Sequence, residues 1–250
     1  LSPDGRRFLF LSRVDEESET PEEKVEDVMW ITKLRYRMDG TGYYPYTRSH
    51  LFTVSAEGGE PGQLTRGPYD VSSADWSPDG GEIAHVANME DGDYTRIRDI
   101  FIIPSKGGSP RKLTDGRTMI RSVAWSPDGE LLAYTGRIPV DPEHPMYGST
   151  DIWVMPPGGG EARNLTSAFD RTVGAYGSSV FWGDNGQIYF RAPRHGAYNL
   201  YMVSVDKGAV EPVIEGKRTL ASFSLCADSS RIAFAATDAT WPQEVWVHDA

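Results

Sequence analysis

Short apolar runs alternate with glycine-containing turns along the whole chain of 250 residues. Five of these runs open with a polar residue and carry an aromatic side chain at the third place. They are His50–Val54, Asp99–Ile103, Asp151–Met155, Asn199–Val203 and Glu244–His248. Four of the five are apolar at nearly every later position, a pattern typical of strands that are covered on both faces. The pattern predicts strands pressed between neighbouring sheets.

One turn motif precedes each of these strands. Trp-Ser-Pro-Asp-Gly occurs at Trp76–Gly80 and Trp125–Gly129, and variants occur at Leu1–Gly5, Trp182–Gly186 and Leu225–Ser229. The proline presets φ for the first corner of a turn, the aspartate can hydrogen-bond to the backbone beyond it, and the glycine takes a left-handed conformation. An apolar strand follows each copy. The motif therefore predicts five hairpins in one repeating register.

A glycine-rich turn and a short closing strand follow each apolar run. Three closing strands end in Leu-Thr, at Leu64–Thr65, Leu113–Thr114 and Leu165–Thr166. The fourth, which ends in Pro212–Ile214, lacks this pair. Segments rich in small residues, such as Val71–Asp75, then lead to the next turn motif and suit an innermost strand. Four antiparallel strands repeated at roughly 40 to 50 residues are typical of a β-propeller blade.

The predicted fold class is all-β, a β-propeller of four-stranded antiparallel blades. We expect residues 1–250 to form a partial propeller, with about three complete and two partial blades. The blades run approximately over residues 1–65, 70–114, 119–166, 174–214 and 219–250. Both ends fall inside a unit, and a ring with missing pieces leaves sheet edges unpaired. We therefore expect the chain to be part of a longer polypeptide.

Three insertions separate the second and third strands of their units. They run from Val14 to Ser49, from Asn88 to Arg98 and from Arg137 to Ser149, and strand alternation places them on one face. The first begins with an acidic run and continues into aromatic and basic residues. The candidate substrate or interdomain contact residues there are Trp30, Arg35, Tyr36, Arg37, Tyr43 and Tyr44. One interpretation is a β-hairpin that covers the end of the ring. The other is a contact surface, because Arg, Tyr and Trp are favoured at such sites.

Charge and composition exclude some classes of function. The net charge of −11 and the acidic isoelectric point offer no basic stripe for nucleic acid. No window approaches the roughly 20 apolar residues of a membrane span. The single cysteine, Cys226, fits a reducing compartment and hence a cytoplasmic location. It stands where sister repeats hold Ser2, Ser77 and Ser126, which indicates a structural role.

The chain carries no recognisable catalytic apparatus. A Gly-x-Ser-x-Gly nucleophile turn is missing, and the five histidines are scattered. Three of these histidines occupy strand positions that other residue types hold in sister repeats. No His, Cys and Asp cluster has metal-ligand spacing. We therefore assign no catalytic residue, metal or cofactor to this chain.

The turn repeat resembles the one shared by TolB-type propellers and the prolyl oligopeptidase family. A more specific stretch, Arg35–Tyr43, continues through His50–Phe52 and Leu64–Thr65 into Trp76–Gly80. That order resembles the N-terminal propeller of acylaminoacyl-peptidase-type members of the prolyl oligopeptidase family. The resemblance implies a seven-bladed or similar ring over a C-terminal α/β-hydrolase domain with a Ser-Asp-His triad, a domain absent from this chain. It also implies short peptide substrates, and contact with a second copy, because members of that family are often oligomers.

Three functional hypotheses follow. The first is a substrate-gating propeller of a serine peptidase that releases acylated amino acids or short peptides from peptide N-termini. The second is a non-enzymatic, TolB-like interaction propeller. The third, an enzyme with a site at its own axis, has the least support, because the small residues of the inner strands supply no clustered acids, bases or metal ligands.

Overall fold

The computed structural model describes residues 1–15, 31, 36–39, 42–43, 47–89, 96–140, 148–174 and 180–249. Within these residues all regular secondary structure is β-strand. No helix in this described part is long and apolar enough to cross a membrane. The all-β fold class predicted from the sequence is confirmed.

Three sheets have four antiparallel strands each, paired in chain order. The first contains β6 (Val71–Trp76), β7 (Glu82–Ala87), β8 (Asp99–Pro104) and β9 (Arg111–Lys112). The second contains β10 (Met119–Trp125), β11 (Leu132–Arg137), β12 (Asp151–Met155) and β13 (Arg163–Asn164). The third contains β14 (Phe181–Trp182), β15 (Gln187–Arg194), β16 (Ala197–Ser204) and β17 (Val210–Ile214).

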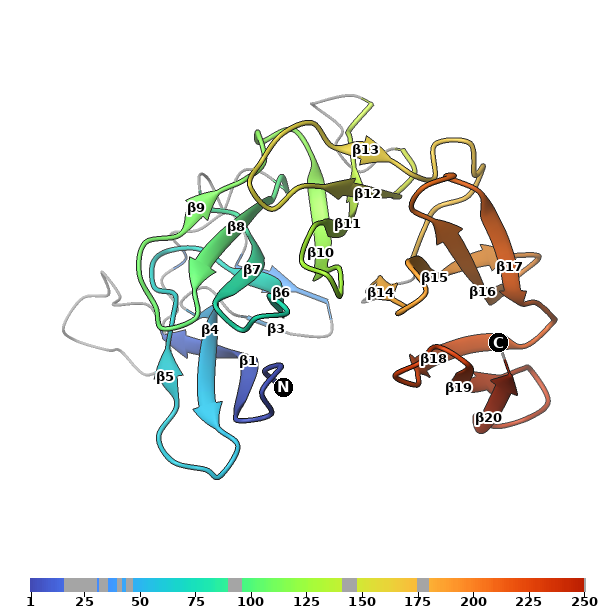
Figure 1. Ribbon diagram of the computed structural model, residues 1–250, viewed down its shortest axis with the longest axis horizontal. Coiled ribbons are helices and arrows are strands. Elements are labelled where there is room, and N and C mark those ends of the chain that lie inside the picture. Colours follow the sequence, from blue (N-terminus) through green and yellow to red (C-terminus); the bar gives the residue numbers. More distant parts are fainter. Residues whose placement is uncertain are drawn as a thin grey trace.

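Two three-stranded sheets flank these three. One contains β1 (Arg7–Asp15), β4 (Thr47–Ser55) and β5 (Gly62–Gln63), and the other β18 (Thr219–Leu225), β19 (Arg231–Thr237) and β20 (Glu244–Asp249). The five sheets follow one another in an arc, with β10, β14 and β18 toward its centre and β9, β13 and β17 toward its rim (Figure 1). This is the arrangement of propeller blades.

A local hydrogen-bond network explains why each turn motif folds. The Ser77 hydroxyl donates to the Asp79 carboxylate at 2.6 Å and accepts the N–H of Glu82 at 2.9 Å. The same carboxylate accepts the N–H of Gly81, and Gly80 has a φ of 70°. These bonds hold the pKa of Asp79 below its ordinary value, chiefly through the serine hydroxyl. The turns at Ser2 and Ser126 repeat the network.

The least regular copy of the turn keeps the same bonds with different atoms. The Cys226 thiol donates to Asp228, and its sulfur accepts the N–H of Arg231 at 3.0 Å. Ser229 takes the left-handed conformation that glycine takes elsewhere, with a φ of 56°. Cys226 is exposed, but it performs the hydrogen bonding of the serine that it replaces.

In three sheets, the polar residue that opens the apolar strand bonds to the threonine that follows the closing strand. Thr166 donates its hydroxyl to Asp151 at 2.9 Å, and the same hydroxyl accepts the N–H of Ile152 at 3.0 Å. Asp99 and Thr114 repeat the arrangement, as do His50 and Thr65. We call each such pair a strand clamp. The clamps give the Leu-Thr repeat of the sequence a structural role.

The core lies between successive sheets. One apolar cluster joins Val86 and Ile100 to Leu132 and Met155 of the next sheet. Strand β8 is buried at its first five positions, as the continuous apolar pattern predicts. Strand β20 differs, because Val245 is 79% exposed. No described element packs on that side of β20, and a strand is covered only where a neighbouring sheet lies against it.

Candidate functional site

The three predicted insertions leave the same face of the propeller. They connect β1 to β4, β7 to β8 and β11 to β12. The last two join the second to the third strand of a four-stranded sheet, and β1 and β4 correspond to those two strands in a sheet that has no described inner strand. We call the side on which they emerge the insertion face. The connections from a closing strand to the next sheet, such as 64–70 and 214–219, lie on this face as well, because antiparallel strands alternate in direction.

A partly buried ion pair anchors the base of the first insertion. Arg48 is 5% exposed and lies 3.3 Å from the partly exposed Asp70 carboxylate, which also accepts the N–H of Ser49 at 2.9 Å. The N–H of Asp70 donates to the side chain of Asn88, where the second insertion begins. The described ends of two insertions are therefore held in a fixed relation.

The third insertion is anchored in a similar way. The Arg137 guanidinium donates to the Thr150 hydroxyl, and the N–H of Thr150 donates to Thr172 in the connection to the next sheet. Burial lowers the pKa of Arg137. At least one end of each insertion is thus bonded to a connection that leads to the next sheet.

Three of the predicted contact residues meet in a small hairpin. Strands β2 (Arg37–Met38) and β3 (Gly42–Tyr43) pair antiparallel. The rings of Tyr36 and Tyr43 stack with centroids 6.1 Å apart, and the Arg37 guanidinium lies 5.5 Å from the Tyr43 ring centroid. Tyr43 is 54% exposed. Two tyrosine rings and a cation therefore form one exposed surface.

The remaining predicted contact residues cannot be placed relative to that hairpin. Trp30, Arg35 and Tyr44 lie outside the described residues. The hairpin itself agrees with both interpretations of the sequence, a cover for the ring and a contact surface. Exposure of stacked tyrosines with an adjacent arginine is typical of contact surfaces.

Two titratable groups of one sheet, Asp75 on β6 and His85 on β7, have pKa values shifted by burial, and both have structural roles. Burial raises the pKa of Asp75 to about 6, although its carboxylate accepts the N–H groups of Trp76 and Trp125. The bond to Trp125 crosses from one sheet to the next. Burial also lowers the pKa of His85 to about 4, and this ring stacks on Phe101. Neither side chain has a nucleophile as a partner. Within the described residues no three His, Cys, Asp or Glu side chains gather as a metal site would require.

A cavity that the sequence analysis missed lies between the last two sheets. Its volume is about 430 Å³, and its walls come from β16, the 214–219 connection, β18, β19 and β20. The sequence does not single it out. The connections before β6 and β14 carry Tyr69 and Phe169, whereas those before β10 (residues 115–118) and β18 (residues 215–218) both carry a glycine between charged residues and no apolar side chain.

Antiparallel sheets set in an arc, with long connections on one face, define this chain as a β-propeller domain with an elaborated insertion face. The family model described as "Acylaminoacyl-peptidase, N-terminal beta-propeller domain" matches residues 15–143. This chain belongs to that family of propeller domains.

Solved structures share the fold. An acylaminoacyl peptidase in complex with Z-Gly-Gly-Phe-chloromethyl ketone aligns with a TM-score of 0.70 and 20% identity, over 99% of this chain and 35% of the other. Pyrococcus horikoshii acylaminoacyl peptidase aligns with a TM-score of 0.69 and 20% identity, over 98% of this chain and 35% of the other. TolB from Acinetobacter baumannii aligns with a TM-score of 0.61 and 20% identity, over 80% of this chain and 46% of the other. The chain thus spans less than half the length of each of these proteins. No curated protein matches it.

Proposed function

We propose that this domain limits access to the active site of a serine peptidase that releases acylated amino acids or short peptides from peptide N-termini. The partner in this proposal is an α/β-hydrolase domain of the same polypeptide, and the substrates are short peptides. A cytoplasmic location, favoured by the single cysteine, and contact with a second copy belong to the same proposal.

Family membership carries the proposal, because the matched residues 15–143 include the whole first insertion. The exposed surface of Tyr36, Arg37 and Tyr43 supports a contact role for that insertion. The propeller's contribution is then steric and electrostatic. A rigid disc excludes folded proteins, and its cationic, aromatic hairpin helps to orient a peptide or to seat the hydrolase domain.

The parent protein provides the test. We expect its reading frame to continue past residue 250 into a domain with a Gly-x-Ser-x-Gly motif. The purified protein is expected to release N-acetylated residues from short acetylated peptides, and a fluorophosphonate is expected to abolish this activity. A reading frame that stops within one blade of residue 250, or a parent protein without such activity, contradicts the proposal.

The second candidate is a TolB-like interaction propeller without enzymatic activity. The similarity of the fold to TolB from Acinetobacter baumannii favours it. It predicts a secretory signal before residue 1 and no hydrolase domain after residue 250. The same reading frame therefore separates the two candidates.

A further inference from the structure

The connections that cross from one sheet to the next differ in what they place at the sheet junction. Tyr69 lies in the apolar cluster between the first two sheets. Phe169 packs between the third and fourth, with its ring 5.7 Å from that of Phe190 and 5.2 Å from that of Tyr201. The connection between the last two sheets, residues 215–218, has no apolar side chain, a feature that it shares with residues 115–118 before β10. The cavity of about 430 Å³ lies at that junction.

Aromatic and aliphatic side chains form most of the cavity wall. Tyr198 comes from β16, Leu220 from β18, Phe234 from β19 and Trp246 from β20. The volume falls within the range of roughly 300–1,000 Å³ that is typical of small-molecule sites. Trp246 is 40% exposed, so the cavity leaves a large aromatic surface open to solvent. An aromatic ring is the complementary occupant, because it recovers that surface and can stack on the wall.

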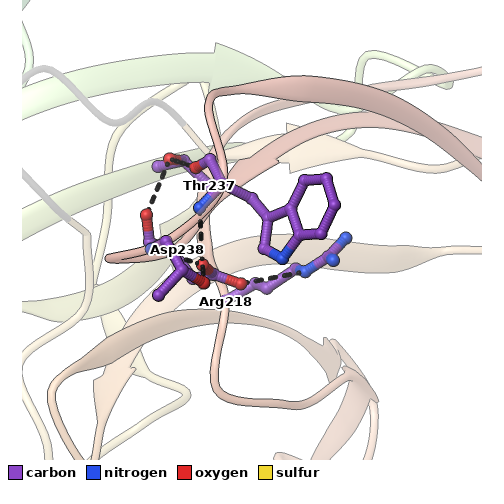
Figure 2. A network of polar contacts seen from close by, with 5 residues as sticks. Arg218, Thr237 and Asp238 are labelled. Atoms are coloured by element: carbon purple, nitrogen blue, oxygen red, sulfur yellow. Dashed lines mark hydrogen bonds and ion pairs between the residues drawn. The ribbon is translucent and has the colours of Figure 1, made fainter.

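A polar network fixes one side of the cavity. The Arg218 guanidinium lies 4.8 Å from the Trp246 ring centroid. It also forms an ion pair of 3.3 Å with Asp238 (Figure 2). Asp238 in turn accepts the N–H groups of Thr240 and Trp241 at 2.8 and 2.9 Å. Arg218 is therefore held as part of the wall, with its charge already matched by a carboxylate.

The charges around the cavity leave one cation unmatched. Glu215 is paired with Arg194 and also accepts the hydroxyl of Tyr201. Lys217 is exposed and, within the part of the chain that the structure describes, has no carboxylate partner. The cavity thus combines an aromatic wall with one free ammonium group, in a chain whose net charge is −11. The ammonium group of Lys217 repels a bound cation and attracts a bound carboxylate.

We propose that this cavity binds a small aromatic carboxylate, with the ring against the wall formed by Phe234 and Trp246 and the carboxylate at Lys217. This site is separate from the hairpin of Tyr36, Arg37 and Tyr43. The proposal does not depend on whether the chain serves a peptidase, because only the last two sheets and the connection between them form the cavity.

The test titrates the full chain with 3-phenylpropionate and follows tryptophan fluorescence and ligand-observed NMR. Saturable binding is expected with a dissociation constant of roughly 1 mM or tighter, a typical value for a ligand of this size. The neutral 3-phenylpropanamide and the cationic 3-phenylpropylamine are expected to bind at least about tenfold more weakly. The three ligands share the phenyl ring and the chain that carries it and differ in the head group, so they separate recognition of the carboxylate from burial of the ring.

Two variants locate the site. Lys217→Gln is expected to weaken binding of the carboxylate at least about tenfold and to leave binding of the amide unchanged. Gly216→Phe supplies an aromatic side chain of the kind that Phe169 provides at its junction, and is expected to abolish binding. A Cβ at Gly216 meets no heavy atom within 4 Å, and the backbone there is not left-handed, so the variant is expected to fold. Matched controls are Lys207→Gln and Gly158→Phe, in turns on the opposite face.

Two results overturn the proposal. One is the lack of saturation by about 10 mM 3-phenylpropionate, well above the expected constant. The other is a dissociation constant for 3-phenylpropionate that is the same in Gly216→Phe and Lys217→Gln as in their matched controls, at equal melting temperatures.

Discussion

His85 faces Phe101 in a cross-strand position that the other four sheets fill with two aromatic side chains. The other pairs are Phe10–Phe52, Tyr134–Trp153, Phe190–Tyr201 and Phe234–Trp246. The imidazole therefore serves as a small aromatic ring in the core. Its position in the repeat predicted a structural role for it. The lowered pKa depends on burial by the neighbouring sheet, which the sequence does not show.

This burial makes stability depend on pH. Because the pKa of His85 falls from 6.5 to about 4 on folding, the unfolded chain binds a proton in a range where the folded chain does not. The wild-type protein is expected to lose stability relative to His85→Phe as the pH falls from about 6.5 to about 4, by at most about 3 kcal/mol. Urea unfolding at several pH values measures the difference. His195→Asn, at an exposed turn, controls for the loss of one imidazole. A difference that stays constant with pH contradicts this account.

Strand clamps operate at the scale of the element. The strands themselves were predictable, because apolar runs and turn residues are local signals. The predicted bounds of the first insertion, Val14 and Ser49, lie within two residues of the strand ends in the structure, since β1 ends at Asp15 and β4 begins at Thr47. The sequence showed that polar residues open these strands and that Thr ends the closing strands, but not that the two side chains bond. That bond joins residues about fifteen positions apart, and it depends on how the sheet twists.

Removing one clamp hydroxyl tests its contribution. Thr166 is 1% exposed, and its hydroxyl serves both Asp151 and the N–H of Ile152. Thr166→Val leaves two buried polar groups without that partner and is expected to cost about 2–3 kcal/mol in free energy of unfolding. Thr166→Ser keeps the hydroxyl and is expected to cost about 1 kcal/mol or less for its lost methyl group. Equal losses in the two variants mean that packing, not the hydroxyl, is what matters.

At the scale of the whole molecule, five sheets share an arc (Figure 1). The three insertions leave the same face of these sheets. The repeat predicted this arrangement, because strand alternation decides the face on which each connection emerges. The relation between Arg48 and Asp70, and the cavity beside Trp246, depend on packing between sheets and were not predictable. The hairpin of Tyr36, Arg37 and Tyr43 was predictable only in part. Its residues were singled out from their types, and the structure shows that three of them meet.

The central claim is that the insertion face, through this hairpin, serves a peptidase active site. The most direct measurement is kcat/KM of the parent protein on a short acetylated peptide, for the wild type and for a Tyr36→Ala, Arg37→Ala, Tyr43→Ala variant. All three described side chains are exposed, so the melting temperature is expected to stay within about 2 °C. We expect kcat/KM to fall at least about fivefold, which corresponds to loss of about 1 kcal/mol of binding or orientation. An unchanged kcat/KM at an unchanged melting temperature contradicts the claim and leaves the hairpin as a cover for the end of the ring.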